Sequence, residues 1–409
     1  MRQTTQPSFL KRLMVGFMIY LIGGFPSLVF ALPSGGEIVS GVGTISQPTD
    51  QDMVIQQSTQ KMIADWQAFG IGATESVQFI QPGTSSIALN RVIGGDPSVI
   101  LGKLSANGQV FLTNASGVLF GPGAQVNVHG LVATTLAISN QDFLDGNYHF
   151  TQDPNQSLTA VVNQGNIEAS GYVGLLAPSV VNSGTIVADL GSVAIGAGTE
   201  AVVDFTGDGL INFSILGAVE GDVVDTEGNV LEDRILNSGL IQANGGKVLL
   251  TAKNAGDVIR NVVNHSGTII AHTVREQNGE IYLLAGDGDI DITGTLDASG
   301  DDAGEAGGTI IAEAGSVVVD GGSILATGND ALGGDISITG TDWVSLGGLV
   351  DASGESGGTI TVNAGALSLA DSVLATGTTG RGGSITLNTK NNSWEVSSAV
   401  VDASGAQGG

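Results

Sequence analysis

The sequence predicts an all-β protein, a right-handed parallel β-helix (solenoid) with an N-terminal cap, and three observations support this fold class. Whole phrases recur about every 25 residues toward the C-terminal end, and strict alternation of apolar and polar residues follows each phrase. Glycine supplies 64 of 409 residues, whereas charged residues are 13% and apolar residues 42%. This apolar content excludes disorder, and small aliphatics with glycine turns suit thin, stacked strands.

The C-terminal phrases are of three kinds. A Gly-Gly-x-Ile phrase recurs at intervals of 26, 24 and 25 residues, at Gly307–Ile310, Gly333–Ile336, Gly357–Ile360 and Gly382–Ile385. Asp-Ala-Ser-Gly and Leu-Ala-Thr-Gly recur at about twice that interval, at Asp297–Gly300, Asp351–Gly354 and Asp402–Gly405 and at Leu325–Gly328 and Leu374–Gly377. Neighbouring units therefore alternate in type.

Each Gly-Gly pair precedes a strand. Ile360, Val362 and Ala364 alternate with Thr361 and Asn363, and this period of two places the apolar residues on one face of an extended chain. We expect the glycines to provide corners of positive φ. A turn-strand unit of this length cannot bury its apolar face alone, so successive units must stack on one another.

A looser version of the pattern occupies the middle of the chain. Asn-x-Gly phrases stand at Asn163–Gly165, Asn182–Gly184 and Asn237–Gly239, with a variant at Asn264–Gly267. Apolar strands are predicted at Tyr172–Ala177, Val193–Ile195, Lys247–Ala252 and Glu280–Ala285. A propeller is disfavoured because its aromatic blade signature is missing, and a β-sandwich does not repeat whole phrases in register.

The first 31 residues read as a secretory signal. Arg2, Lys11 and Arg12 precede an uncharged apolar run that ends at Phe30, and Ala31 offers a small residue for cleavage. A membrane anchor is the rival interpretation, but Gly23, Gly24 and Pro26 interrupt the run, and no later stretch is apolar enough to span a membrane.

The two ends of the mature chain give further expectations. The segment from Leu32 to Leu104 is less repetitive and contains Trp66, Phe69 and Phe79, so we expect it to cap the first coil. The sequence stops at Gly408-Gly409, inside a repeat phrase, and we expect a longer protein to continue from there.

The net charge and the cysteine content limit which partners and which export route the chain can have. Removal of the three basic residues of the signal leaves 10 Lys and Arg against 40 Asp and Glu, a net charge of −30. Such a chain repels phosphate backbones, which excludes nucleic acid as a partner. The chain has no cysteine. A disulfide would block threading of an unfolded chain through a pore, so its absence fits export across a second membrane, although chance explains it equally well.

A stretch of the N-terminal region resembles a known family. The resemblance is carried by Trp66–Phe69, Ile71-Gly72, Val77–Pro82, Asn90–Val92, Gly102–Val110, Gly117–Ala124 and Val128–Thr134, together with the mature start Leu32–Gly36. This ordered set resembles the N-terminal secretion (haemagglutination activity) domain of filamentous-haemagglutinin-like exoproteins of two-partner secretion. The repeats beyond it are generic.

The resemblance implies a domain order and a partner. Residues 1–31 would be the signal peptide, residues 32–150 the two-partner secretion domain with its cap, and residues 151–409 continuing β-helix repeats. An outer-membrane barrel transporter would bind the domain unfolded through its periplasmic recognition domains and thread it outward, where it folds at the cell surface of a Gram-negative-type bacterium.

The resemblance also assigns a recognition and secretion motif. Its residues are Asn90, Arg91, Asn107, Gly108, Asn114, Gly117, Val118, Phe120 and Gly121. The family often has Asn-Pro-Asn-Gly where this chain has Asn114-Ala115-Ser116-Gly117. Ala115 can still enter a type I turn, so the departure concerns recognition by the partner rather than the fold.

The implied function is that of an adhesin, a haemagglutinin-like exoprotein that binds a host or neighbouring-cell receptor or glycan. A stalk that carries a contact-dependent toxin and a haem-binding passenger are alternatives within the family. We expect no enzyme activity, no cofactor and no metal.

A polysaccharide-acting β-helix enzyme is the rival from another class. Its acids would be Asp287, Asp289 and Asp291, or Asp301 and Asp302, but Lys and Arg are scarce after Lys253. No ligand spacing relates the four histidines, His129, His149, His265 and His272. Gly286–Asp289 suggests calcium, yet the nonapeptide of calcium-binding β-rolls is not repeated, and solvated acidic turns account for these residues.

Overall fold

The computed structural model describes residues 32–408 apart from 206–210, 255–260, 275–276 and 391–392. The expected signal peptide, residues 1–31, lies outside the described residues. The chain divides into two units, residues 1–30 and 31–409, and all described residues belong to the second. Within the described residues, no helix is long and apolar enough to cross a membrane.

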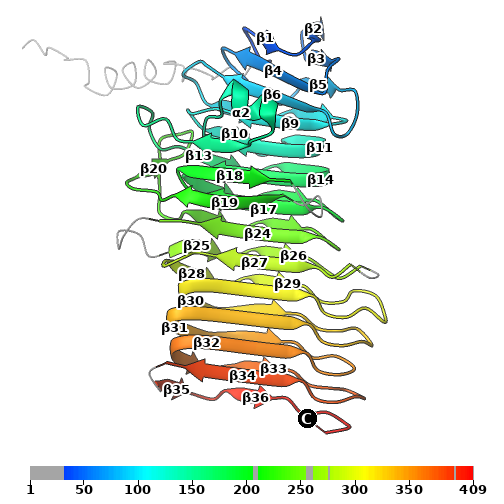
Figure 1. The fold of residues 1–409 in the computed structure, drawn as a ribbon, viewed down its shortest axis with the longest axis vertical. Helices are drawn as coiled ribbons and strands as arrows, with labels where there is room; N and C mark the ends of the chain where they lie inside the picture. Colours follow the sequence, from blue (N-terminus) through cyan, green and yellow to red (C-terminus); the bar gives the residue numbers. More distant parts are fainter. Residues whose placement is uncertain (1–31, 206–210, 255–260, 275–276, 391–392, 409) are drawn as a thin grey trace, which may run out of the picture. The chain divides into compact units, whose positions relative to one another are not determined.

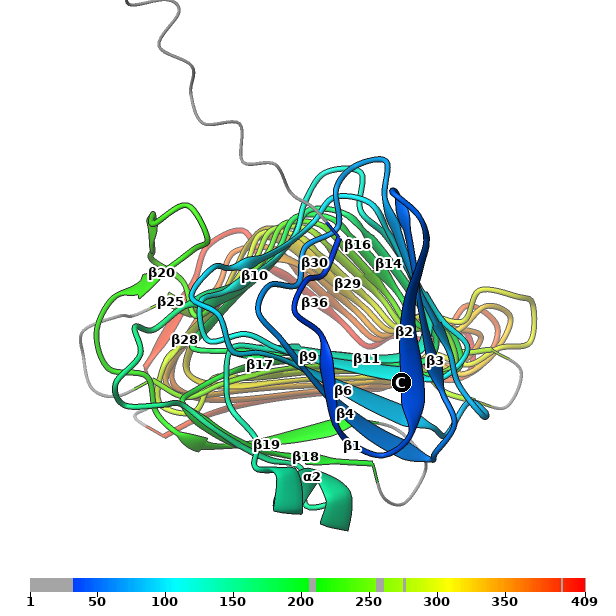
Figure 2. The same ribbon diagram turned by 90° about the horizontal axis from the view of Figure 1, so that it is seen from above.

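The described chain winds as a parallel β-helix, with three parallel sheets that successive coils extend by one strand each (Figures 1 and 2). Sheet I contains β4 (Lys61–Trp66), β6 (Ile87–Val92), β9 (Gln109–Thr113), the ends of β11 (Gln125–Thr134) and β14 (Asn166–Ala177), β17 (Ser192–Ala197), β24 (Lys247–Ala252), β27 (Glu280–Leu284), the starts of β30 (Thr309–Leu325), β31 (Asp335–Asp351) and β32 (Thr359–Leu369), and β34 (Ser384–Thr389).

The other two sheets complete each coil. Sheet II contains β7 (Ser98–Ile100), β10 (Val118–Phe120), β13 (Ala160–Asn163), β15 (Ser179–Asn182), β22 (Ile235–Asn237), β25 (Asn261–His265), β28 (Asp289–Ile292), later parts of β30, β31 and β32, and β35 (Trp394–Val396). Sheet III contains β3 (Asp52–Gln57), β5 (Ser76–Ile80), β8 (Lys103–Ala106), the starts of β11 and β14, β16 (Thr185–Val187), β23 (Leu240–Gln242), β26 (Thr268–Ile270), β29 (Thr295–Asp297), the ends of β30 and β31, β33 (Ser372–Leu374) and β36 (Val400–Asp402).

Two strands at the N-terminal end pair differently. β1 (Glu37–Ser40) runs antiparallel to β4, and β2 (Gly43–Thr49) runs antiparallel to β3. The parallel pairing starts where β3 meets β5 and β4 meets β6.

The phrases found in the sequence lie in register. Ile310, Ile336, Ile360 and Ile385 are aligned partners in sheet I. The alternation of unit types is confirmed in sheet III, where the aligned positions are Asp297, Leu325, Asp351, Leu374 and Asp402. The predicted alternation along each strand is also confirmed, because Ile360, Val362 and Ala364 are buried.

The expected role of the Gly-Gly pairs is wrong in one respect. None of these glycines is among the residues with positive φ. A Cβ atom added at Gly334 would lie 2.1 Å from the carbonyl oxygen of Gly308, and one at Gly358 would lie 2.1 Å from that of Gly334. Stacked backbones therefore approach too closely for any side chain, which is the physical reason for glycine at these positions.

Two insertions form a second layer that the sequence did not predict. Between Thr134 and Ala160 the chain forms α2 (Asn140–Asp145) and β12 (His149–Thr151). Between Ala197 and Ile235 it forms β18 (Glu200–Asp204), β19 (Asn212–Gly217), β20 (Val223–Val224) and β21 (Val230–Leu231). We call α2, β12, β18 and β19 the cover, because they pack an apolar cluster against the outer side of sheet I (Figure 2).

Candidate partner-recognition site

The nine residues of the candidate motif lie in two consecutive coils near the N-terminal end. Asn90 and Arg91 belong to β6, Asn107 and Gly108 form the turn between β8 and β9, and the other five surround β10. The structure thus brings them into one region, but their side chains do not converge on a common surface.

Asn90 points into the interior and is fully buried. Its Oδ1 accepts a hydrogen bond from Nε1 of Trp66 at 3.1 Å, and its Nδ2 donates to the carbonyl oxygens of Ala88 at 3.2 Å and Phe111 at 3.3 Å. A buried amide needs such partners because an unpaired one costs about 1–3 kcal/mol. Asn90 therefore holds an indole in place inside an otherwise apolar core.

Arg91 lies on the outer side of sheet I and joins two layers. Its Nε and Nη2 donate to the two carboxylate oxygens of Asp65, at 2.9 and 3.0 Å, a bidentate pair of high geometric specificity. Its Nη1 donates to Oδ1 of Asn140 at 2.7 Å, at the start of α2. Lys61 secures the other end of α2, donating to the carbonyl oxygens of Phe143 and Leu144 at 2.8 and 2.9 Å.

Asn107 connects two neighbouring coils through their backbone. Its Oδ1 accepts from the N–H of Gln81 at 2.7 Å, and its Nδ2 donates to the Gln81 carbonyl oxygen at 2.8 Å. Gly108 follows in a crowded position, where an added Cβ atom would lie 2.7 Å from the Gly83 carbonyl oxygen. A side chain at Gly108 would collide with the preceding coil, and replacement of Asn107 would remove these partners of the Gln81 backbone.

The segment Asn114–Gly117 forms the turn that the sequence predicted. The N–H of Gly117 donates to the Asn114 carbonyl oxygen at 3.0 Å, and the N–H of Ser116 donates to Asn114 Oδ1 at 2.9 Å. Asn114 Nδ2 donates to the Asp96 carbonyl oxygen and to Ser98 Oγ, both at 3.0 Å. Gly117 has φ of +110°, a conformation that a side chain would strain.

The apolar members of the motif close this coil. Val118 and Phe120 are fully buried in β10, which is paired with β7 on one side and β13 on the other. The N–H of Gly121 donates to the Ile100 carbonyl oxygen at 2.8 Å. In the folded chain, every polar side chain of the motif has partners within the fold; Asn90 and Asn114 are buried, Arg91 keeps a side-chain exposure of 25%, and Asn107 is exposed at its turn.

The residues considered for other chemistry are dispersed. Asp289 and Asp291 alternate with buried Ile290 and Ile292 along β28, and burial raises the pKa of Asp291. Asp301 and Asp302 lie in the turn after β29. Asp301 Oδ1 is 3.9 Å from His272 Nδ1. Among the described residues, no three His, Cys, Asp or Glu side chains are placed to hold a metal ion.

The four histidines have different partners. His129 Nδ1 lies 2.8 Å from Ser170 Oγ, and His149 Nε2 lies 2.9 Å from Glu200 Oε1. His272 Nε2 lies 3.2 Å from Asp297 Oδ2, a hydrogen bond that raises the pKa of His272. His265 is fully buried inside the coil.

A polar ladder inside sheet II was missed by the sequence analysis. Asn163, Asn182, Asn237 and His265 are aligned partners, all fully buried. Asn163 Nδ2 donates to Asn182 Oδ1 at 2.8 Å, and Asn182 Nδ2 donates to Asn237 Oδ1 at 2.7 Å. The Asn-x-Gly phrases were the available signal, because the same residue type at the same phrase position stacks upon itself.

Comparison with known proteins identifies the family. The model of the TPS secretion domain family, the two-partner secretion domain, matches residues 36–298. The chain belongs to this family. Exoproteins with a TPS secretion domain leave Gram-negative bacteria through an outer-membrane transporter, the partner of the two-partner system, so the resemblance seen in the sequence is confirmed.

Two curated proteins and one solved structure are similar to this chain. A heme/hemopexin-binding protein of Haemophilus influenzae is 34% identical over 264 residues, 63% of this chain and 27% of the relative, and a second one is 30% identical over 271 residues, 62% and 28% of the two chains. The chain thus spans about a quarter of these relatives. The HMW1 secretion domain from Haemophilus influenzae is 27% identical, with a TM-score of 0.78 over 92% of this chain and 100% of that one.

Proposed function

We propose that the nine motif residues form the export signal that the outer-membrane transporter reads on the unfolded chain. The internal bonding of these residues supports this proposal. A partner that met the folded coil would find the amides of Asn90, Asn107 and Asn114 already engaged, whereas an extended chain presents all of them. The same side chains then stabilise the first coils once the chain emerges.

Each segment of the chain has its own step in secretion, in the order of the sequence. Residues 1–31 direct passage across the inner membrane, residues 32–150 engage the transporter, and residues 151–409 extend the coil at the surface. Coils that form outside disfavour backward movement, because each one buries its apolar face on the coil before it. We infer a right-handed coil, the handedness of nearly all parallel β-crossovers. The antiparallel pairing of β1 and β2 supports a cap at the N-terminal end, which would protect that open edge.

The exported protein would act as a haemagglutinin-like adhesin for a cell-surface receptor or glycan, secreted or held at the bacterial surface. A second candidate is capture of haem or hemopexin, which the 34% identity to a heme/hemopexin-binding protein favours. Carriage of a toxin is a third, weaker alternative, since no observation on the described coils favours it. No chemistry at the site argues for an enzyme.

The transporter's periplasmic domains test the export signal directly. The purified chain, either folded or freshly diluted from urea, would be titrated with these domains and binding followed by fluorescence anisotropy. We expect the unfolded chain to bind, the folded chain not to bind, and Asn107→Ala with Asn114→Ala to weaken binding of the unfolded chain. Asn363→Ala, on the outer side of sheet I, is the matched control. Equal binding of folded and unfolded chains would refute the proposal.

The two candidate roles of the exported protein separate in one comparison. Binding of the folded chain to red cells or epithelial cells supports the adhesin, whereas binding of haem, followed by its absorbance, or of immobilised hemopexin supports the second candidate. Both assays use chain that is already folded and purified. Their results therefore do not depend on the outcome of the transporter experiment.

A further inference from the structure

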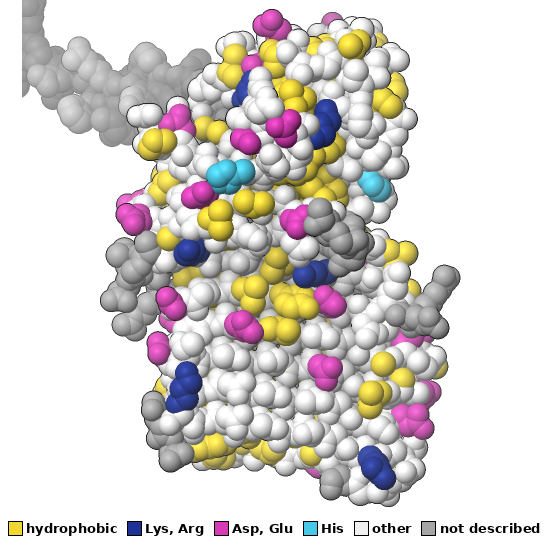
Figure 3. Space-filling model, in the orientation of Figure 1, with side chains coloured by type: hydrophobic (Ala, Val, Ile, Leu, Met, Phe, Trp, Pro, Cys, Tyr) yellow, Lys and Arg dark blue, Asp and Glu magenta, His cyan; other side chains and the backbone are white. Residues whose placement is uncertain are grey.

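The outer side of sheet I changes character along the coil. From β4 to β17 it carries an apolar cluster beneath the cover, to which Ile63, Leu89 and Phe111 contribute. From β31 onward this outward column becomes polar, with Ser337, Thr361 and Thr386 aligned where Leu249, Tyr282 and Ile311 stand in earlier coils. Figure 3 shows this face, on which apolar atoms are frequent in the upper and middle coils and sparse in the lower ones.

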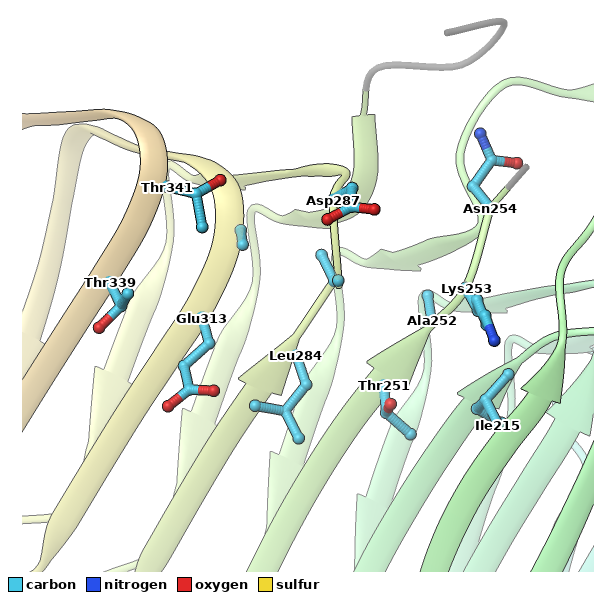
Figure 4. A pocket seen from close by; sticks show the side chains of 13 residues that line it. Ile215, Thr251, Ala252, Lys253, Asn254, Leu284, Asp287, Glu313, Thr339 and Thr341 are labelled. Carbon is cyan, nitrogen blue, oxygen red and sulfur yellow. The ribbon is translucent and has the colours of Figure 1, made fainter. Parts of the chain in front are cut away.

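Two hollows begin at the edge of the cover and follow the polar part of the sheet. The first has a volume of about 520 Å³ and extends from Ile215 of β19 to Thr339 and Thr341 (Figure 4). The second, of about 170 Å³, includes the same two threonines and continues to Asn388 and Lys390. We call the two hollows together the trough. The first lies within the size range of ligand sites in proteins.

The floor of the trough is a single column of residues. Thr251, Leu284, Glu313, Thr339, Asn363 and Asn388 are aligned partners on consecutive strands of sheet I. At roughly 4.8 Å per strand, these six positions span on the order of 24 Å along the coil axis. A surface with this repeat suits a linear ligand that lies across the strands.

The polar groups of the trough are available to a ligand. Thr339, Thr341 and Glu313 make no side-chain hydrogen bond or ion pair with another described residue. Asn363 and Asn388 use one hydrogen bond between them, from Nδ2 of Asn388 to Oδ1 of Asn363 at 3.0 Å, and keep their other groups. The motif residues differ in this respect, because their polar atoms already have hydrogen-bond partners within the fold.

The chemistry of the trough selects among linear ligands. Hydroxyl, amide and carboxylate groups can donate to and accept from vicinal hydroxyls, while Leu284 and Ile215 offer apolar contact to the face of a sugar ring. Asp287 and Glu313 lie in the first hollow, and Lys253 donates to the Leu216 carbonyl oxygen at 3.0 Å. With a formal net charge of −27 over the whole chain, a polyanion is repelled.

We propose that the trough binds a linear glycan of neutral or amino sugars, an inference that rests on the adhesive function proposed above. The glycan lies along the coil axis, its hydroxyls meet Glu313, Thr339 and Asn363, and amino groups, where present, lie near Asp287 and Glu313.

The folded, full chain would be titrated calorimetrically with short and long oligomers of N-acetylglucosamine and of glucosamine, and with polygalacturonate as a polyanion. We expect affinity to rise with oligomer length and polygalacturonate not to bind. A triple variant, Glu313→Ala with Thr339→Val and Asn363→Ala, should lose about tenfold or more in affinity, as expected when several hydrogen-bond partners disappear. The matched control is Ser345→Ala with Ser368→Ala, aligned residues on the outer side of sheet II.

Several outcomes would overturn the inference. They are equal affinity of the triple variant and the wild type, tighter binding of polygalacturonate than of the neutral oligomers, and no binding of any neutral or amino-sugar oligomer. Cell adhesion is measured separately on the same variants. If the triple variant adheres as the wild type does, glycan binding by the trough is refuted and the adhesive function stands. If the wild type adheres to no cell, the adhesive function is refuted, and calorimetry alone decides whether the trough binds a glycan.

Discussion

The coils before β30 and the coils from β30 onward differ in what their interior contains. Within the described residues, all buried polar or charged side chains lie at or before Glu305. The later interior consists of Ile, Val, Leu and Ala. The early coils thus have their register set by individual hydrogen-bond partners, while the later coils rely on repeated phrases.

The consequence concerns register. A shift of the early strands would separate Asn182 from its neighbours in the ladder and leave buried amides unpaired, at about 1–3 kcal/mol each. A shift of the later strands by one whole phrase would place Ile360 where Ile336 stood, with little loss. The polar residues therefore act against misalignment in the N-terminal part of the chain.

The largest expected effect comes from a charge buried in each region. Phe120→Asp should abolish folding and export, because a carboxylate without partners in the core costs several kcal/mol and the following coils stack on this one. Leu369→Asp should unfold only the last coils and leave the rest of the chain resistant to protease. Limited proteolysis and the secreted amount, measured for both variants, test the contrast. Normal secretion of Phe120→Asp would contradict it.

The second effect isolates one buried partner pair. Asn90→Leu removes the acceptor of Trp66 Nε1 and should lower the free energy of unfolding by about 2–3 kcal/mol, since the indole N–H stays buried and unpaired. Adding Trp66→Phe to Asn90→Leu should restore part of the loss, because neither polar group then remains. Urea unfolding of the four proteins of this cycle gives the coupling energy. Simple addition of the two single effects would show that the hydrogen bond is unimportant.

The sequence predicted the regular part of the fold and not its second layer. Strict alternation at Ile360, Val362 and Ala364 has a single physical solution, a strand with one buried face, and the phrases fix how strands align. The segment around α2 has no such periodicity. It folds because the outer side of sheet I is itself apolar, with Leu89, Phe111 and Val132 on that side, and such a face must be covered.

The candidate site stays a prediction from the sequence, and the bonding of its residues could not be predicted at all. Resemblance can point to Asn107, yet only the coil geometry shows that Asn107 bonds both backbone groups of Gln81. The role expected for the Gly-Gly pairs failed for the same reason. Close approach between stacked backbones depends on residues about 25 positions apart, and no local pattern around Gly334 reveals it.

The third prediction uses the histidine that ends the polar ladder. Asn237 Nδ2 can only donate, so His265 Nδ1 accepts this bond at 3.1 Å, and Nε2 donates to the Thr295 carbonyl oxygen at 2.9 Å. This arrangement requires the neutral ring. Burial lowers the pKa of His265, against the opposing effect of hydrogen bonding to the backbone of Thr295 and Asn237. On the adjacent β28, Asp289 and Asp291 point outward, and the aligned partner of His265 is the apolar Ile292.

The sign of the pH dependence follows. The unfolded chain protonates this histidine near pH 6.5 and the folded chain only at lower pH, so the unfolded state binds more protons in between. The contribution of His265 to stability is complete above about pH 6.5 and is lost as the pH falls below it, with a slope of up to about 1.4 kcal/mol per pH unit. His265→Asn continues the ladder and should remove this loss.

Urea unfolding of the wild type and of His265→Asn at a series of pH values measures the difference. His272→Gln is the control with the opposite sign. The hydrogen bond to Asp297 raises the pKa of His272, so the contribution of His272 is present below about pH 6.5 and is lost as the pH rises through its folded value. A flat difference between the wild type and His265→Asn across the acidic range would rule out the ladder as a pH-sensitive element.

The smallest effect tests whether the coils with the Asp-Ala-Ser-Gly phrase are interchangeable on the two sides of the boundary at β30. Ser299 and Ser353 occupy the same place in two Asp-Ala-Ser-Gly phrases, and each Oγ accepts from the Oγ1 of a threonine in the next coil, Thr327 or Thr376, at 2.9 Å. Ser299→Ala and Ser353→Ala should each cost about 0.5–1 kcal/mol, because each removes the same partly buried bonds. If phrase repetition alone sets the register here, the two losses are equal and the double variant loses their sum. Unequal losses in urea unfolding would show that these coils, like the earlier ones, have individual partners that set their order.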